Sequence, residues 1–278
     1  MMVSTTSQAM DLGSACTLVH RYGTGDAASK VIGLHSLGLD GRSFGPLGLG
    51  LAETGEFETF APDLRGHGAS DAPVHTIDLG RMAADVVELA RQLRGERVHL
   101  VGTSMGSVVA RIATATHPEM WSSVTLIAGP PTAVPGIGVR GNSARRSGMA
   151  AVVDETLARW FSGHALAGPS ASVEYAAQVL REMNPESWAA SWAAMESFAT
   201  PGPIPTAIDT LCIAGEDDVS TPPAVVAELA RVSGSKRPPV VIAGGTHQLL
   251  LDHADEIAAL LQNRWREPDN SRQIGMES

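Results

Sequence analysis

Several residue types are scarce in this sequence, and each scarcity argues against a class of protein. The two cysteines, Cys16 and Cys212, lie far apart and form neither a disulfide framework nor a cluster with metal-ligand spacing. Lys and Arg number 20 against 30 Asp and Glu, and the net charge of −10 argues against binding to nucleic acid or to an anionic membrane. Because no run of about 18 apolar residues occurs, no membrane-spanning helix is predicted.

The composition of the chain is that of a folded globular protein. Hydrophobic residues make up 44% and charged residues 18%, which excludes a wholly disordered chain. Residues 1–15 contain no Lys, no Arg and no continuous apolar stretch, so they do not resemble a secretory signal. With both thiols reduced, a cytoplasmic location is expected. The polar tail after Arg266 is expected to be disordered.

Short apolar runs alternate with helical periods along most of the chain. Six runs are predicted to be buried strands: 30–34, 59–62, 97–101, 123–127, 210–213 and 239–242. Runs that are continuously apolar suit a parallel sheet covered on both faces. Apolar stripes with helical spacing follow at 79–93, 222–232 and 252–265. The alternation predicts an α/β fold with a mostly parallel, doubly wound sheet.

The predicted helices carry recognisable boundary residues. Thr76 or Asp78 is expected to cap the helix at 79–93, and Gly95 is expected to end it. Thr221 is expected to cap the next helix, with Pro222 at its first helical position, where proline is favoured.

One segment, 131–206, breaks the alternation. Prolines gather at both of its ends, at positions 130, 131 and 135 and again at 201, 203 and 205. Between them only helical patterns occur, near 149–161, 171–183 and 185–198, and half of the twelve aromatic residues lie there. We therefore predict a helical cap at 131–206, inserted into a core formed by 1–130 and 207–278.

The most informative motif joins an apolar strand to a helical period through Gly102-x-Ser104-x-Gly106. A serine on such a tight strand-to-helix turn has a strained backbone and an exposed hydroxyl, and the glycines allow the strand and helix to approach closely. The N-terminus of the following helix favours a developing oxyanion. A bare G-x-S-x-G is weak on its own, but in this setting it predicts that Ser104 is a nucleophile.

A nucleophilic serine needs a base and a group that orients the base. Two later loops offer them, each directly after an apolar strand. Asp217 and Asp218 follow the run at 210–213, and His247 follows the run at 239–242. Functional sites of open α/β sheets form at the carboxyl ends of the strands, where both loops lie. Either aspartate could serve on this reasoning.

With these motifs the chain resembles the α/β-hydrolase superfamily over nearly its whole length. The 35–44 run His-Ser-Leu-Gly-Leu-Asp-Gly-Arg-Ser-Phe is similar to the family's oxyanion loop, although the family usually has His-Gly at its start. The 63–70 run Asp-Leu-Arg-Gly-His-Gly-Ala-Ser is similar to the family's D-x-R-G-x-G-x-S turn. The nucleophile motif, the acidic loop and the histidine loop follow in the family's order. The fold expected is therefore the α/β-hydrolase fold.

The resemblance implies a role for each matching residue. Ser104 would be the nucleophile, His247 the general base and Asp218 the acid, because the family places the acid four residues before a proline, here Pro222. Asp217 remains the alternative. The backbone N–H groups of Leu37 and Met105 would form the oxyanion hole, the latter because it follows the nucleophile. The 63–70 turn is expected to be structural, with Asp63 or Arg65 tying loops together.

The resemblance also implies an activity. We expect a serine hydrolase that cleaves a small carboxylic ester or lactone without metal or organic cofactor. The Ser-Leu-Gly-x-Asp form of the oxyanion loop, with the Asp-Leu-Arg-Gly-His-Gly turn, looks most like that of 3-oxoadipate enol-lactonases and related small esterases. Carbon–carbon hydrolysis of a dienoic diketone, cofactor-free haloperoxidase-like chemistry, acyl transfer and small-molecule reception remain alternatives. The carbon–carbon reaction would need a cationic clamp, for which Arg111 and the cap arginines Arg140, Arg145 and Arg146 are candidates.

The cap is expected to hold part of the substrate. The residues predicted to contact the substrate are Trp160, Trp188, Trp192 and Met195 of the cap, together with His35 of the oxyanion loop. The alternative for the cap residues is that their apolar stripes only pack the cap onto the core. The expected partner is a small-molecule substrate, with neither nucleic acid nor membrane, and a homodimer is left open.

Overall fold

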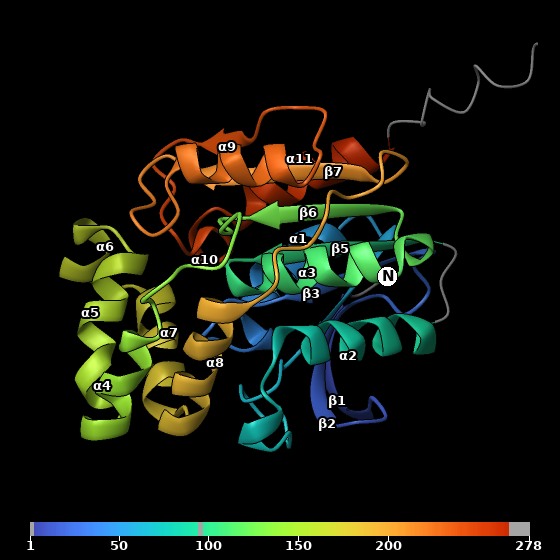
Figure 1. Cartoon of the computed structure of the whole chain (residues 1–278). Helices are drawn as coiled ribbons and strands as arrows, with labels where there is room; N and C mark the ends of the chain where they lie inside the picture. The colour runs from blue at the N-terminus through green and yellow to red at the C-terminus, as the bar shows by residue number, and fades with distance from the viewer. Residues whose placement is uncertain (1–2, 94–96, 267–278) are drawn as a thin grey trace, which may run out of the picture.

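The computed structural model describes residues 3–93 and 97–266 and contains one eight-stranded sheet (Figure 1). Its strands are β1 Ser4–Asp11, β2 Cys16–Gly23, β3 Ser29–Leu34, β4 Phe57–Pro62, β5 Arg97–Thr103, β6 Ser123–Ile127, β7 Asp209–Gly215 and β8 Val240–Ile242. They lie in the order β1-β2-β4-β3-β5-β6-β7-β8. All neighbours from β4 to β8 are parallel, while β1–β2 and β2–β4 are antiparallel. The predicted doubly wound, mostly parallel sheet is confirmed.

Helices cover both faces of this sheet. The core helices are α1 Gly45–Ala52, α2 Leu79–Gln92, α3 Met105–Thr116, α9 Pro223–Val232, α10 Leu249–Asp252 and α11 Ala254–Arg266, with short 3-10 turns at Gly41–Phe44, Val74–Thr76 and Pro118–Met120. One apolar cluster joins α2, α3 and α9 to the sheet, and a second joins α1 and α11 to its other face. Most of the buried strand residues are apolar, on both faces of the sheet, because helices cover both faces.

Five further helices lie between β6 and β7. They are α4 Val139–Ser147, α5 Ala150–Trp160, α6 Gly163–Ala167, α7 Ala171–Glu182 and α8 Pro185–Ser197, and together they are called the helical insertion below. In Figure 1 they gather beyond the end of the sheet toward which the β6 arrow points. The carboxyl ends of the parallel strands, and the loops that follow them, therefore face the insertion.

Strands β1 and β2 are not among the predicted strands. The residues of β1 are almost all polar and exposed, so they carry no apolar run that would mark a strand. β1 nevertheless pairs with β2 along its whole length, from Ser4 opposite Gly23 to Asp11 opposite Cys16. A two-stranded hairpin whose outer strand forms a sheet edge needs little burial of its own when the sheet supports it.

Two predicted helix starts need correction. Helix α9 begins at Pro223, one residue later than expected, and Thr221 does not cap it because its hydroxyl bonds elsewhere. The helix expected from about 252 is α11, which begins two residues later at Ala254, and the short α10 precedes it. At α2 the cap is Asp78, which accepts the Arg81 N–H. Gly95 and the tail after Arg266 lie outside the described residues.

Within residues 3–93 and 97–266, none of the helices combines the length and the apolar character that crossing a bilayer requires.

Candidate active site

Ser104 lies on a strained turn between β5 and α3. Its backbone has φ 52° and ψ −115°, a region that side-chain-bearing residues rarely adopt. The flanking glycines explain how the turn fits. A methyl group at Gly102 would lie 2.2 Å from the Gly106 carbonyl oxygen, and one at Gly106 would lie 2.1 Å from the Leu34 carbonyl oxygen. Strand and helix therefore touch through backbone, and the serine projects from the turn as the motif predicts.

His247 connects Ser104 to an acidic side chain. Its Nε2 atom lies 3.1 Å from the Ser104 Oγ, and its Nδ1 atom lies 2.8 Å from the Asp218 Oδ2. In the neutral tautomer in which Nδ1 donates to Asp218, Nε2 is free to accept the serine proton. The three groups come from loops after β5, β7 and β8, all at the carboxyl edge of the sheet. The structure thus brings Ser104, His247 and Asp218 together in one hydrogen-bonded chain.

The two candidate aspartates differ sharply in their surroundings. Asp218 is 2% exposed, whereas Asp217 is exposed and makes no side-chain hydrogen bond to a described residue. Burial alone would raise the pKa of Asp218. The electrostatic interaction and hydrogen bond with His247 and the hydrogen bonds from Thr221 outweigh burial and lower that pKa below its ordinary value. The geometry therefore favours Asp218 over Asp217 as the partner of His247.

Thr221, which was predicted to cap a helix, is part of the site. Its N–H donates to Asp218 Oδ1 over 3.0 Å, and its hydroxyl lies 2.7 Å from Asp218 Oδ2 and 2.8 Å from the Ala128 carbonyl oxygen. The Ser220 N–H donates to the same Oδ1. The Asp-x-x-Thr spacing is the signal that could have revealed this turn, since an Asp side chain readily accepts backbone N–H groups two and three residues later.

The loop predicted to supply the oxyanion hole follows β3. The Leu37 and Met105 N–H groups form no hydrogen bond to another described residue, so both donors remain available. Gly38, beside Leu37, has φ +87°, and a methyl group there would lie 2.7 Å from Trp188 Cζ3 and about as close to Leu180 and Trp160. The helical insertion therefore packs directly on this loop.

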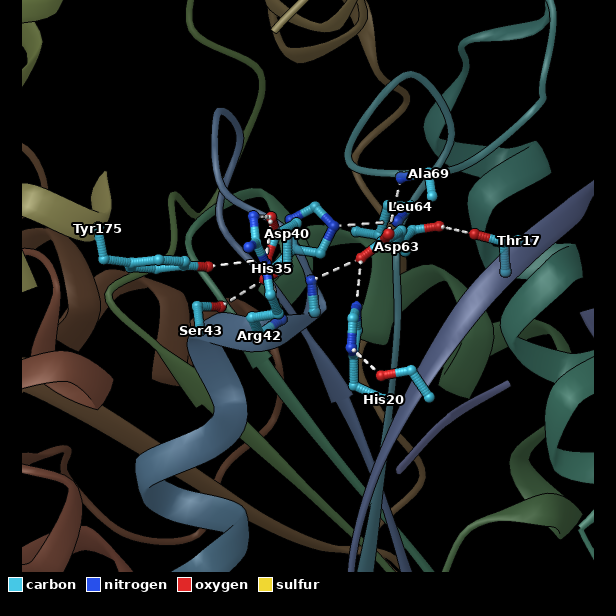
Figure 2. A network of polar contacts seen from close by, with 12 residues as sticks. Thr17, His20, His35, Asp40, Arg42, Ser43, Asp63, Leu64, Ala69 and Tyr175 are labelled. Atoms are coloured by element: carbon cyan, nitrogen blue, oxygen red, sulfur yellow. Dashed lines mark hydrogen bonds and ion pairs between the residues drawn. The ribbon is translucent and has the colours of Figure 1, made fainter. Parts of the chain in front are cut away.

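His35 occupies a different place from the one predicted for it. Its ring is fully buried, Nδ1 donates to the Ser36 carbonyl oxygen, and Nε2 accepts the Leu64 N–H over 2.9 Å (Figure 2). Burial lowers the pKa of His35, which keeps the ring neutral. Because both ring nitrogens are used, His35 fastens the oxyanion loop to the loop after β4 and has no atom free for a substrate.

The Asp63 carboxylate connects the same two loops. Its carboxylate accepts the N–H groups of Gly41 and Ala69 at 2.9 and 2.8 Å and lies 3.2 Å from His20 Nε2. Burial raises and these hydrogen bonds lower the pKa of Asp63, and the lowering dominates. Arg65 forms a separate buried ion pair with Asp85 of α2. Asp63 therefore ties two loops together, and Arg65 ties its own loop to α2 and to the Val74–Thr76 turn.

Besides this packing, a polar contact joins the helical insertion to the oxyanion loop. Tyr175 of α7 donates its hydroxyl to Asp40 Oδ1 over 2.8 Å, and Arg42 pairs with the other oxygen of this buried carboxylate (Figure 2). Burial alone would raise the pKa of Asp40, but these hydrogen bonds outweigh it and lower the pKa. Burial and the charge of Asp40 raise the pKa of Tyr175, so its hydroxyl stays protonated and donates.

The aromatic residues predicted to contact substrate lie in the insertion and are largely buried. Trp160 and Trp188 pack on Gly38, and Trp188 also donates its Nε1–H to the Arg140 carbonyl oxygen. Trp192 packs edge to face against Trp188, and its buried Nε1 has no partner among the described residues. Met195 lies in the same apolar cluster. Most of these contacts are packing contacts between side chains of the protein. The buried Trp192 Nε1–H is left without a hydrogen-bond partner among the described residues.

The cationic candidates are distributed differently. Arg140 stacks on the Trp192 ring, with its guanidinium carbon 5.0 Å from the ring centre, and Arg145 pairs with Glu186 at the surface. Arg111 is fully buried and bonds to backbone carbonyls. Within the described ranges no group of three or more His, Cys, Asp and Glu side chains is arranged to hold a metal ion.

The model of the Alpha/beta hydrolase family matches residues 31–260, which include every loop described above. The chain therefore belongs to the alpha/beta hydrolase family, and the predicted fold and superfamily are confirmed.

Two curated relatives are similar over part of the chain. A 2-(acetamidomethylene)succinate hydrolase of Mesorhizobium japonicum is 31% identical over 121 residues, which cover 44% of this chain and 42% of the relative. The 3-oxoadipate enol-lactonase 1 of Acinetobacter baylyi is 28% identical over 137 residues, 49% of this chain and 50% of the relative. The chain spans about half the length of these curated relatives, or less.

Solved structures match almost the entire chain. An enol-lactonase from Burkholderia xenovorans has a TM-score of 0.82 at 24% identity, covering 94% of this chain and 100% of its own. An esterase from Thermogutta terrifontis has a TM-score of 0.81 at 21% identity, covering 96% of this chain and 98% of its own. At these identities the likeness establishes the shared fold.

Proposed function

We propose that the chain is a serine hydrolase that cleaves a small carboxylic ester or lactone through an acyl-enzyme. The observation that carries the proposal is the hydrogen-bonded chain from Ser104 through His247 to Asp218, built on a strained turn. Ser104 is the nucleophile, His247 the general base and Asp218 the residue that orients and stabilises the imidazolium. Esterases and enol-lactonases among the similar proteins support the same class of reaction.

The geometry supports a two-stage reaction. The Ser104 Oγ attacks the substrate carbonyl carbon as its proton passes to His247 Nε2, and the N–H groups of Leu37 and Met105 stabilise the oxyanion. The carbon–oxygen bond of the ester then breaks, and His247 returns the proton to the leaving alcohol. In a lactone this alcohol stays attached to the acyl group. Water attacks the acyl-enzyme with His247 as base, which releases the acid and restores Ser104.

The helical insertion supplies the proposed wall of the substrate site. Trp160 and Trp188 pack on the oxyanion loop beside Leu37, so an acyl group bound to Ser104 would meet their rings. The unpaired Nε1–H of Trp192 is a candidate donor to a polar substrate atom. Met195 completes this proposed surface. His35 is not part of it, for the reason given above.

The substrate class can be tested by comparing three sets of compounds. We expect turnover of p-nitrophenyl esters with short acyl chains and of small lactones, and a fall in kcat/KM as the acyl chain lengthens against the insertion. A chromogenic dienoic diketone serves as the control for carbon–carbon cleavage. Turnover of the diketone with esters and lactones left intact would contradict the proposal, and tight binding without any turnover would favour a receptor.

The contact between Tyr175 and Asp40 yields a further prediction. Tyr175→Phe removes the hydroxyl that ties α7 to the oxyanion loop and leaves the ring packing in place. We expect kcat/KM for a short p-nitrophenyl ester to fall by about tenfold, the effect of losing one hydrogen bond to a charged group. Steady-state kinetics, with a melting curve to verify folding, measure this.

Asp40→Asn is the companion variant, because it keeps an acceptor for Tyr175 but removes the charge paired with Arg42. It is expected to retain more activity than Tyr175→Phe if the tie to the insertion is what matters. Wild-type kcat/KM in Tyr175→Phe would show that the insertion does not position the oxyanion loop through this bond.

A further inference from the structure

The helical insertion is attached to the core by two connections, residues 128–138 after β6 and residues 198–208 before β7. Both are rich in proline, which donates no backbone N–H. Segments of this kind cannot pair extensively with one another through their backbones, so some of their carbonyl groups need donors from elsewhere. The two connections lie about 70 residues apart in the sequence, and nothing in their local pattern brings them together.

One side chain reaches both connections. Arg111 of α3 donates from Nη1 to the Pro131 carbonyl oxygen over 2.7 Å and from Nη2 to the Pro201 carbonyl oxygen over 3.3 Å. The planar fork of a guanidinium suits such a bridge, because it presents several N–H donors in fixed directions. A lysine ammonium, a single point of charge, would not match the two carbonyls in the same way.

The burial of Arg111 is unusual for a charged residue. Its side chain is fully buried, its Nε has no partner, and no carboxylate among the described residues pairs with it. Burial lowers the pKa of Arg111, which reflects the cost of placing a charge there. A buried arginine without a counter-ion lowers stability compared with an apolar side chain. Any stabilising effect of Arg111 must therefore come from the backbone carbonyl groups to which its N–H groups are bonded.

The position of Arg111 relates these connections to the nucleophile. Arg111 lies seven residues after Ser104, about two turns along the helix that begins directly after the nucleophile. Hydrogen bonds from this helix to both connections therefore attach the insertion to the same rigid helix that positions Ser104.

We propose that Arg111 is a positioning residue that clamps both connections of the helical insertion and thereby holds the insertion against the oxyanion loop. Where it concerns catalysis, this inference rests on the proposed function. Arg111 touches no reacting atom in it. Loss of Arg111 frees the two connections. Trp160 and Trp188, which form the proposed wall of the substrate site, are then no longer held in a fixed position relative to Leu37 and Ser104.

Arg111→Met tests the clamp, since methionine fills similar space without donors. Two backbone amides report on the connections directly: the Val134 N–H, bonded to the Met195 carbonyl oxygen, and the Ile204 N–H, bonded to the Ser233 carbonyl oxygen. We expect hydrogen exchange at both to accelerate at least about tenfold, the factor from losing one charge-assisted hydrogen bond, while amides of β5 stay unchanged. We also expect KM for a short p-nitrophenyl ester to rise about tenfold with kcat nearly constant.

Thr114→Val is the matched control, because Thr114 is buried on the same helix and, among the described residues, its hydroxyl bonds only to the Ala110 carbonyl oxygen of that helix. A merely structural role of Arg111 would accelerate the β5 amides together with the two reporters and leave KM unchanged. Exchange rates and KM in Arg111→Met equal to those of Thr114→Val would overturn the proposal. If Arg111→Met does not fold, Arg111→Lys decides by the same amides, and it is expected to free at least one connection.

The outcomes separate this inference from the proposed function. Hydrogen exchange does not depend on activity, so it tests the clamp even if the wild-type protein hydrolyses no ester. Absence of ester and lactone turnover in the wild-type protein would contradict the proposed function and leave the clamp to be judged by the Val134 and Ile204 amides alone.

Discussion

Ser104→Ala is expected to lower kcat for a short p-nitrophenyl ester by about 10³- to 10⁶-fold while the protein remains folded. The reason is that Ser104 Oγ is the only hydroxyl within hydrogen-bonding distance of His247 Nε2 among the described residues. Alanine removes the nucleophile but leaves the oxyanion donors, so only weak residual catalysis should remain. Steady-state kinetics on the purified variant, with active-site concentration taken from protein mass, measure the loss.

The matched control is Ser107→Ala, three residues along the same turn. The Ser107 hydroxyl donates to the Ser104 carbonyl oxygen and is not bonded to His247. Its loss removes one ordinary hydrogen bond, so we expect an effect of at most about tenfold. Full esterase activity in Ser104→Ala would contradict the proposed mechanism. Equal losses in the two variants would point to damage of the turn in place of loss of the nucleophile.

Asp218→Asn is expected to lower kcat by about 10⁴-fold. An asparagine at this position can donate to His247 Nδ1, which would favour the tautomer that carries its proton on Nε2. That tautomer cannot accept the Ser104 proton. The neighbouring variant Asp217→Asn changes the charge of the loop by the same amount, but the Asp217 side chain is exposed and makes no hydrogen bond to a described residue, so its kcat should stay within about threefold of wild type. Kinetics of the pair at one pH measure the contrast.

The acid dependence of Asp218 has a defined sign. Its pKa is lowered from the ordinary value of 3.8, so the folded protein keeps the carboxylate ionised at that pH, and the stabilising contribution is fully present only above it. The contribution is lost as the pH falls through the lowered pKa. In Asp218→Asn this acid-dependent part of the unfolding free energy should be missing.

A large loss of activity in Asp217→Asn with Asp218→Asn unaffected would reverse the assignment of Asp218 as the acid that pairs with His247.

Local patterns predicted the parts of the fold whose determinants are close in the sequence. Apolar runs marked six of the eight strands because strands buried on both faces are continuously apolar. The glycine spacing around Ser104 predicted a tight turn, which the close approaches at Gly102 and Gly106 explain. The hairpin β1–β2 was not predicted, because a polar edge strand is stabilised by pairing and not by burial.

The contacts around the site were harder to predict because they join distant segments. Tyr175 and Asp40 are 135 residues apart, and the reach of Arg111 to Pro201 spans 90 residues. Nothing in the local sequence of α7 or α3 indicates these partners. His35 shows the opposite error, since its place in a motif predicted a substrate contact, whereas burial among backbone donors and acceptors gives it a bracing position.

The measurement that tests the central claim most directly is the mass of the covalent adduct formed with a small fluorophosphonate. The account predicts one adduct per chain, located on the peptide that contains Ser104, absent in Ser104→Ala and formed far more slowly in Asp218→Asn. An adduct on another residue, or ester hydrolysis that continues with no adduct at Ser104, would contradict the assignment of Ser104 as the nucleophile.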